Sequence, residues 1–165
     1  MLNVTLRACA LSLPMVVAFP VAAQDSRPAV TATSPDGSIA LTVSTDSDSR
    51  PVWSLSRKGK LLIAPSKLGF ILTDGLNMVR GFAIAGSEKG SGKDRWEQPW
   101  GERRFVTDNH NDLLVRFKQS DVQGARLMNV RFRLFDDGVG FRYELPEQPG
   151  LKTMRITGET TEFDI

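Results

Sequence analysis

The sequence predicts an all-β protein whose strands pair antiparallel into a sandwich or a barrel, and three observations support this fold class. Short runs of alternating apolar and polar residues recur about every ten residues, with turn residues between them. No segment keeps apolar residues at helical spacing over several turns, so no amphipathic helix is expected. Residues 130–145 contain two alternating runs around an Asp-Gly turn, which is the pattern of a β-hairpin.

The hairpin of residues 130–145 is the strongest of these signals. Asp137 and Gly138 suit a tight two-residue loop, because Gly adopts positive φ without a steric clash. This loop sets Leu134 opposite Phe141 and makes one face of the hairpin apolar, whereas a three-residue loop would mix the two faces. The other face then carries four charged side chains: Arg131, Arg133, Arg142 and Glu144.

The first half of the chain predicts a series of strands joined by turns. Ser34-Pro35-Asp36-Gly37 has the composition of a tight turn, and Lys58-Gly59-Lys60 predicts a second one. Trp53 alternates with serines and is expected in the core, and Pro65 is expected to break a strand. The expected strands cover residues 30–33 (at a sheet edge), 39–44, 53–56, 61–63 and 68–72.

The second half predicts further strands separated by loops. Residues 87–95 are rich in Gly, Ser and Lys and predict an exposed, mobile loop. Residues 108–112 are expected to interrupt the strand signal before 113–117. The last strand is expected within 154–165, with Ile156 as its clearest apolar residue.

The first 23 residues have the organisation of a signal peptide. Arg7 is followed by an apolar stretch, and Ala23 ends a small-residue cleavage site. The predicted domain organisation is a signal peptide over 1–23, a flexible start over 24–29 and one β-sandwich domain over 30–165. We therefore expect a periplasmic or secreted protein with no membrane attachment after cleavage behind Ala23.

Charge and cysteine content narrow the function classes. Loss of Arg7 lowers the formal net charge from +2 to +1, which argues against a nucleic-acid partner. Cys9 is the lone cysteine and lies in the expected signal peptide. The mature chain would therefore have no disulfide, no cysteine nucleophile and no cysteine metal ligand.

Several blocks in the mature chain together resemble one enzyme family, the N-terminal domain of glycoside hydrolase family 97. These enzymes are exported bacterial α-glucosidases and α-galactosidases. The similarity is carried by order and spacing over nearly the whole mature chain, with supporting blocks at 34–37 and 65–69. The blocks are residues 99–104 (Pro-Trp-Gly-Glu-Arg-Arg), 108–113 (Asp-Asn-His-Asn-Asp-Leu), 132–144 (Phe-Arg-Leu-Phe-Asp-Asp-Gly-Val-Gly-Phe-Arg-Tyr-Glu) and 159–163 (Glu-Thr-Thr-Glu-Phe).

The resemblance implies an antiparallel β-sandwich similar to the galactose-mutarotase-like supersandwich. In the family, this domain packs on a (β/α)8 barrel that supplies the general acid and the nucleophile or base. Because the sequence ends at Ile165, we expect an incomplete sandwich without the barrel. No catalytic residue and no metal ligand of the family can be assigned to a residue here, and calcium is expected only in a complete family member.

The best candidate surface for a sugar or a domain interface is the segment around Trp100. Trp100 lies close to Glu102 and Arg104, which gives an aromatic side chain with charged neighbours. The alternative is that Trp100 fills the end of the sandwich, because large aromatic side chains are usually well buried.

His110 and Asn111 are the second candidate for contact with a sugar or a neighbouring domain. His110 is the lone histidine, so neither a zinc ligand set nor a two-histidine epimerase site is available. A hydrogen-bonding role in a loop is the alternative. Asp136 and Asp137 are expected to be turn residues, and Glu159 and Glu162 solvent-facing residues or rim contacts to a barrel.

The sequence is consistent with two functions. The first is a non-catalytic N-terminal module that packs against the barrel of an α-glycosidase. The second is a stand-alone exported module that binds an oligosaccharide. An independent enzyme ranks below both, because no pair of carboxylates or catalytic triad can be assigned.

Overall fold

The computed structural model describes residues 27–73, 77–119, 126–149 and 153–165, and all regular structure within these ranges is β-strand. None of the described residues forms a helix long and apolar enough to cross a membrane. The strands are β1 (Val30–Thr33), β2 (Ile39–Thr45), β3 (Pro51–Arg57), β4 (Lys60–Lys67), β5 (Phe70–Leu72), β6 (Phe82–Glu97), β7 (Phe105–Gln119), β8 (Leu127–Leu134), β9 (Val139–Glu144) and β10 (Ile156–Glu159).

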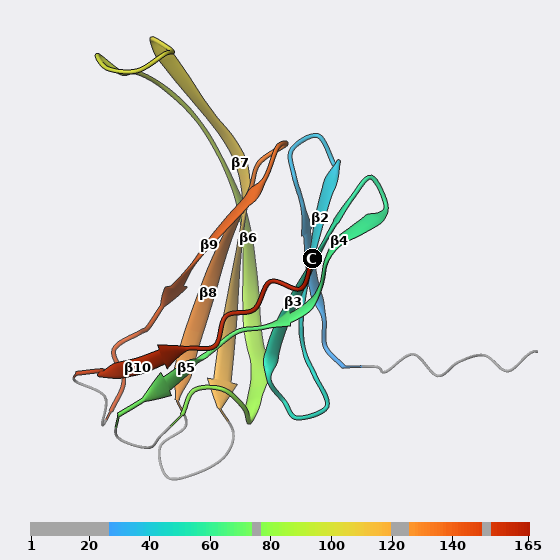
Figure 1. Cartoon of the computed structure of the whole chain (residues 1–165), viewed down its shortest axis with the longest axis vertical. Helices are drawn as coiled ribbons and strands as arrows, with labels where there is room; N and C mark the ends of the chain where they lie inside the picture. Colours follow the sequence, from blue (N-terminus) through green and yellow to red (C-terminus); the bar gives the residue numbers. More distant parts are fainter. Residues whose placement is uncertain (1–26, 74–76, 120–125, 150–152) are drawn as a thin grey trace, which may run out of the picture.

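The strands form two antiparallel four-stranded sheets and a shorter pair (Figure 1). One sheet has the order β1-β2-β3-β4, the other has the order β6-β7-β8-β9, and β5 pairs with β10. Side chains of the two large sheets meet in a common core, where Trp53 of β3 contacts Phe132 of β8 with ring centroids 6.2 Å apart. This arrangement confirms the predicted antiparallel β-sandwich.

The core follows the alternation of the sequence. Ile39, Leu41 and Val43 of β2 are at most 2% exposed, while the residues between them are partly exposed. Trp53 is 1% exposed and contacts Phe141 as well as Phe132, as the core prediction required. Removal of each such side chain from water contributes about 1.5–3 kcal/mol to folding, and this burial drives the pairing of the sheets.

Both predicted turns in the first half are present. Gly37 ends the first turn with φ of 73°, and the Ser34 hydroxyl donates to Asp36 Oδ1 at 2.6 Å. Lys58 and Gly59 both have positive φ, 49° and 78°, between β3 and β4. Positive φ at both central residues suits the right-handed twist of a hairpin, so this turn fixes the β3–β4 pairing.

The prediction that Pro65 breaks a strand is wrong. β4 runs through Pro65 and pairs with β3, with register shifts on either side of Leu55. Pro65 has no partner on β3, because it falls at a register shift of the ladder, where a missing N–H is tolerated. The following strand is shorter than expected, because β5 covers only Phe70–Leu72.

The predicted loop at residues 87–95 and the predicted interruption at 108–112 are also wrong. β6 and β7 are continuous strands that pair from Phe82↔Gln119 to Glu97↔Phe105. Their register explains the small residues, because Gly92 lies opposite His110. A Cβ on Gly92 would lie 2.5 Å from His110 Cε1, so glycine makes room for the imidazole ring.

The hairpin of β8 and β9 has the predicted faces but a register shifted by two residues. The ladder ends at Leu134↔Val139, and Phe132 rather than Leu134 lies opposite Phe141. One further backbone hydrogen bond, from Phe135 N–H to the Gly138 carbonyl, closes the connection. Gly138 does not adopt positive φ, so the expected Asp-Gly loop geometry is wrong. A two-residue shift preserves the parity of the strands and therefore the apolar face.

The last segment contains a shorter strand than predicted. β10 spans four residues, and its Ile156 is 50% exposed rather than a core residue. Beyond β10 the backbone passes Gly69, where Thr160 N–H donates to Gly69 O at 2.9 Å, and then follows β4, where Glu162 N–H donates to Lys67 O at 2.9 Å. This segment thus lines the side of the first sheet opposite β3.

Candidate functional site

The longest strand pair leaves the body of the sandwich and forms an arm. Pairing between β7 and β8 ends at Asn111↔Leu134, whereas pairing between β6 and β7 continues to Glu97↔Phe105. Residues 92–110, here called the arm, therefore form a two-stranded ribbon that extends past the ends of β8 and β9 (Figure 1). Its strands have no third strand beside them among the described residues.

Exposed aromatic and cationic side chains cluster at the tip of the arm. Trp100 is 84% exposed, Trp96 is 45% exposed and Phe105 is 44% exposed. The guanidinium groups of Arg95 and Arg104 lie 4.2 and 5.4 Å from the centre of the Phe105 ring, within cation–π distance. The tip thus presents a surface with both apolar and charged parts.

The backbone of the tip is held by its own hydrogen bonds. Gln98 N–H donates to Arg104 O at 2.9 Å, and the Gln98 side-chain amide donates to Arg103 O at 3.0 Å. Arg104 Nε also pairs with Glu97 Oε1 at 2.8 Å. Gly101 has φ of 114°, a conformation that side chains other than that of glycine rarely adopt. These bonds order the loop while Trp100 stays exposed.

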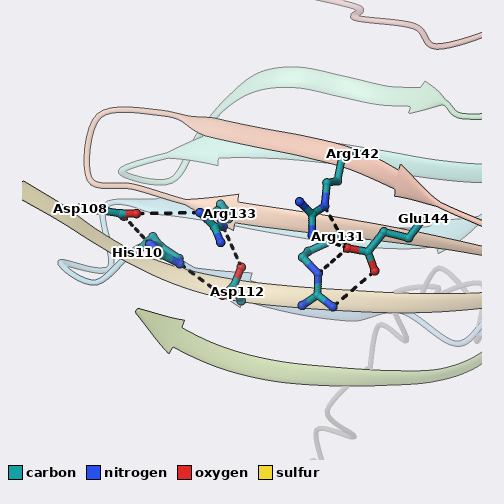
Figure 2. Close-up of polar contacts among 7 residues, drawn as sticks. All are labelled: Asp108, His110, Asp112, Arg131, Arg133, Arg142 and Glu144. Atoms are coloured by element: carbon teal, nitrogen blue, oxygen red, sulfur yellow. Dashed lines mark hydrogen bonds and ion pairs between the residues drawn. The ribbon is translucent and has the colours of Figure 1, made fainter. Parts of the chain in front are cut away.

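A polar cluster around one buried histidine lies at the root of the arm (Figure 2). It comprises Asp108, His110 and Asp112 on β7 and Arg133 on β8, here called the His110 cluster. His110 is 6% exposed; its Nδ1 contacts Asp108 Oδ1, and its Nε2 lies 3.2 Å from Asp112 Oδ2. Phe135 packs on the imidazole with ring centroids 5.5 Å apart. His110 is therefore in a strand, and the prediction of a loop histidine is wrong.

The protonation state of His110 determines which of its two contacts are hydrogen bonds. A neutral imidazole carries one N–H and can donate to one carboxylate, so both contacts are hydrogen bonds only in the imidazolium form. Arg133 adds a second cation, with Nε 3.5 Å from Asp112 Oδ1. Asp112 Oδ1 is fully buried and makes no hydrogen bond, so only this longer ionic contact compensates its charge. The contact between Arg133 and Asp112 joins β8 to β7, and both Asp108 and Asp112 contact His110.

A second charged group lies further along the same outer face (Figure 2). Arg131 Nε donates to Glu144 Oε1 at 2.7 Å, and Arg142 Nε donates to the same oxygen at 2.9 Å. The Arg131 guanidinium, assisted by that of Arg142, holds the pKa of Glu144 below its usual range. Glu144 in turn raises the pKa of Arg131. The charged face predicted for the hairpin is thus a network of ion pairs.

Two polar contacts link the sheets near the root of the arm. The Asn111 side-chain amide donates to Thr33 O of β1 at 2.8 Å. Asp136 Oδ1 accepts from Asp36 N–H at 2.9 Å, which joins the β8–β9 turn to the β1–β2 turn. Asp36 has a pKa well below its usual range, chiefly because the Ser34 hydroxyl donates to it. Asn111 and Asp136 therefore have clear structural contacts.

The five predicted site residues fall into two places. Trp100, Glu102 and Arg104 lie together at the tip of the arm, and Trp100 does not fill the end of the sandwich. His110 and Asn111 are six or more residues further along, which is about 20 Å along a strand, and they point to opposite faces. Trp96 lies in β6, one residue before the end of the strand.

Sequence reasoning missed the partners of His110. Asp108, His110 and Asp112 alternate with two asparagines, which is the period-two pattern of a strand and a signal available in the sequence. Arg133 could not be found in this way, because it comes from the neighbouring strand. Asp136 lies in a turn, as predicted. Glu162, which was predicted to face solvent or to contact a barrel, pairs with Lys67 at 3.0 Å.

The donor set does not fit a metal ion. Within the described residues, no group of three or more His, Cys, Asp or Glu side chains is placed to hold one. Asp108 and Asp112 contact His110, and Asp112 also pairs with Arg133.

Comparison with known proteins places these features in an enzyme family. The family model described as Glycosyl-hydrolase 97 N-terminal matches residues 32–165. A curated relative from Streptomyces bingchenggensis (strain BCW-1), named "Probable retaining alpha-galactosidase", is 31% identical over 159 residues. That alignment covers 94% of this chain and 23% of the relative.

Solved structures show the same fold. A glycoside hydrolase family 97 enzyme from Pseudoalteromonas sp. strain K8, in complex with panose, is 42% identical with a TM-score of 0.76. The match covers 81% of this chain and 20% of that enzyme. A β-arabinopyranosidase is 26% identical with a TM-score of 0.74, over 85% of this chain and 21% of that enzyme.

Each of these relatives matches most of this chain. The chain spans about a fifth of the length of the enzymes it matches. The matched region contains the arm, the His110 cluster and the hairpin of β8 and β9. By both sequence and structure, the chain belongs to the N-terminal domain family of glycoside hydrolase family 97.

Proposed function

We propose that this chain is the non-catalytic N-terminal module of an exported α-glycosidase and that it packs against a (β/α)8 catalytic barrel. The proposal is supported by the family, whose matched members are enzymes about five times as long as the aligned region. The polar clusters of this domain are engaged in internal ion pairs. Its contribution to the enzyme is therefore a surface, not a reacting group.

The arm is the observation that carries the proposal. It extends beyond the sandwich and exposes Trp96, Trp100 and Phe105, which its own domain does not cover. Exposed aromatic side chains that lie together and are bordered by charges are typical of an interaction surface. Arginine beside an aromatic ring is also typical of the residues that dominate binding energy. We infer that the tip of the arm contacts the barrel.

A chimera tests this function. The matched region of the Pseudoalteromonas enzyme is replaced by the corresponding residues of this chain, and hydrolysis of p-nitrophenyl α-glucoside is measured. Trp100→Ala should lower the activity or the melting temperature of the chimera, whereas Leu61→Ala should change neither. Leu61 is a matched control because it is also exposed, at 58%, but lies on β4 away from the arm. Equal behaviour of the two variants would refute the arm as the docking element.

A second candidate function is oligosaccharide binding by the chain itself. Trp100, Glu102 and Arg104 place an exposed ring beside charged side chains, and Glu102 makes no hydrogen bond or ion pair with a described residue. Isothermal titration of the 165-residue chain with panose and with an α-galacto-oligosaccharide tests it. Heat that disappears in Trp100→Ala supports binding at the tip, and no heat from a chain shown to be folded rejects it.

Calcium binding is proposed only for a complete family member. Titration of the chain with Ca²⁺ should then leave its melting temperature unchanged. A rise in the melting temperature of the chain alone would overturn this proposal, since a ligand of the native state stabilises it.

Export is proposed from the leader, which lies outside the described residues. The proposal places the mature protein in the periplasm or the medium, with Gln24 as its first residue. Mass spectrometry of the protein recovered from a bacterial periplasm tests both statements. A chain that keeps Met1 and stays in the cytoplasm would contradict them.

A further inference from the structure

Three arginines occupy neighbouring positions on the outer face of the β8–β9 hairpin. Arg131 on β8 lies directly opposite Arg142 on β9, and Arg133 lies two residues further along β8, on the same face. The fourth position of this block, opposite Arg133, is Gly140. Like charges that lie directly opposite each other in a sheet are destabilising, so the block is unfavourable unless anionic groups compensate it.

Glu144 compensates one end of the block (Figure 2). Its Oε1 accepts from Arg131 Nε at 2.7 Å and from Arg142 Nε at 2.9 Å, and Arg142 Nη2 lies 2.8 Å from the same oxygen. One carboxylate oxygen therefore serves two guanidinium groups. The Arg131 guanidinium holds the pKa of Glu144 below its usual range, which is the effect expected of a face that stabilises negative charge.

Arg133 is the least compensated of the three arginines. It makes no hydrogen bond with a described residue, and its contacts are ionic, with Nε 3.5 Å from Asp112 Oδ1 and Nη1 3.9 Å from Asp108 Oδ2. Both carboxylates also contact His110. They lie on β7, across β8 from Gly140. The Arg133 side chain is 49% exposed, so its N–H donors are accessible to a ligand on the β9 side.

A small cleft lies between these arginines. Its volume is about 210 Å³, and no acidic side chain of the described residues lines it. The cleft is smaller than the roughly 300–1,000 Å³ of sites for drug-sized ligands, so it suits a single small group. Glycine keeps it open, because a Cβ at position 140 would meet nothing within 4 Å. The residues that line it include Arg131, Arg133, Phe135, Gly140 and Arg142.

We propose that Arg131, Arg133, Arg142 and Gly140 form a binding site for one small oxyanion group, namely a carboxylate, sulfate or phosphate that is carried by a sugar or free in solution. Guanidinium groups bind such groups through paired N–H···O hydrogen bonds. Diagonal neighbours across a strand pair lie about 7–8 Å apart, within reach of long side chains. Arg133 and Arg142 are such neighbours, so both can contact one anion above Gly140.

Titration of the chain at pH 7 tests the proposal. Sodium sulfate, sodium phosphate and sodium glucuronate are each added at constant ionic strength, because added salt alone would screen the surface ion pairs. NMR of the arginine Nε–H groups should show saturable shifts for Arg133 and Arg142 with at least one of these anions and none with glucose. The absence of a saturable shift with all three anions overturns the site.

The same titration identifies the source of the anion. Saturation with glucuronate supports a carboxylate carried by a sugar. Saturation with sulfate or phosphate alone supports a tetrahedral oxyanion. The tip of the arm takes no part in this site, so either result is independent of the proposed docking function.

A pair of arginine variants separates a defined site from general attraction by charge. Arg133→Gln should weaken anion binding at least about tenfold, because it removes a charge-assisted donor. Arg116→Gln is the matched control: Arg116 is 45% exposed, lies on neighbouring β7 and pairs with Glu88, but does not line the cleft. Its loss should change the affinity by less than about twofold. Equal losses in the two variants would overturn the site.

Gly140→Val tests the cleft without a change of charge. Gly140 does not have positive φ, and β-branched side chains suit a strand, so the melting temperature should change little. Anion binding should be lost, because the valine side chain occupies the space between the arginines. A Gly140→Val chain that binds the anion as tightly as the parent would refute the placement of the ligand above Gly140, even if Arg133→Gln fails to fold.

Discussion

His110 is the residue on which the root of the arm depends. Its ring contacts two carboxylates of its own strand and fills the space above Gly92 on β6. Buried acceptors that lose their donor keep the cost of desolvation. The single histidine of the chain is therefore a structural residue in this domain, although sequence reasoning offered it as a contact to a sugar or a neighbouring domain.

Replacement of His110 should destabilise the domain. His110→Ala removes the ring that contacts both Asp108 and Asp112, and the free energy of unfolding should fall by about 2 kcal/mol. Thr107→Ala, an exposed position on the same strand, should stay within about 0.5 kcal/mol of the parent. Urea unfolding at neutral pH measures both. An unchanged midpoint for His110→Ala would show that the cluster contributes no net stability.

Gly92 should be coupled to His110. Gly92→Ala brings a Cβ to 2.5 Å from the ring and should cost about 1–3 kcal/mol, whereas Gly86→Ala meets no atom within 4 Å. In a His110→Ala background the Gly92→Ala change should cost little, because the ring is gone. A double-mutant cycle by urea unfolding measures this coupling. Additive effects would mean that the two residues do not share the space.

Glu144 should make stability depend on pH. Its folded pKa lies below the unfolded value because of Arg131, so its stabilisation is complete above the unfolded pKa, near 4.5. It is lost as the pH falls through the folded pKa. Glu144→Gln should therefore lower the free energy of unfolding by roughly 1 kcal/mol at pH 7 and by less at pH 3. A difference that grows on acidification would contradict this sign.

The turn of the β8–β9 hairpin acts at the scale of the element. Two adjacent aspartates occupy it, but only Asp136 reaches the neighbouring sheet, through the backbone of Asp36. Asp137 is exposed and has no such contact. This hydrogen bond therefore links the β8–β9 turn to the first sheet.

Paired substitutions separate the roles of these aspartates. Asp136→Ala should lower the free energy of unfolding by about 1 kcal/mol through the lost hydrogen bond, and Asp137→Ala should leave it unchanged. Thermal unfolding followed by circular dichroism measures both variants. Equal losses would indicate that turn propensity, rather than the contact with Asp36, is the dominant effect.

For the whole molecule, the two sheets should unfold together. Trp53 of the first sheet packs on Phe132 and Phe141 of the second, and no other interior is available to either sheet among the described residues. Trp53→Ala should cost about 3–5 kcal/mol. Trp96→Ala, on the exposed arm, should cost less than about 0.5 kcal/mol. Denaturation followed by fluorescence and circular dichroism tests this, and separate transitions would contradict a shared core.

The amino-acid sequence alone was sufficient to predict the fold class, the turns at Gly37 and Gly59, the apolar face of the β8–β9 hairpin and the family. These features depend on local alternation and on turn residues, which a single segment carries. The apolar face of the β8–β9 hairpin was predicted even though its register was two residues off, because a two-residue shift leaves every side chain on the same face.

The conformation and contacts of the polar segments depend on which strands lie beside them. Residues 87–95 look like a loop in isolation and are a strand because β7 pairs with them along their whole length. Arg133 pairs with Asp112 from another strand, and Asp136 reaches Asp36 across 100 residues of chain. Such contacts depend on which strands become neighbours, and burial of the whole apolar surface, rather than any local pattern, selects that arrangement.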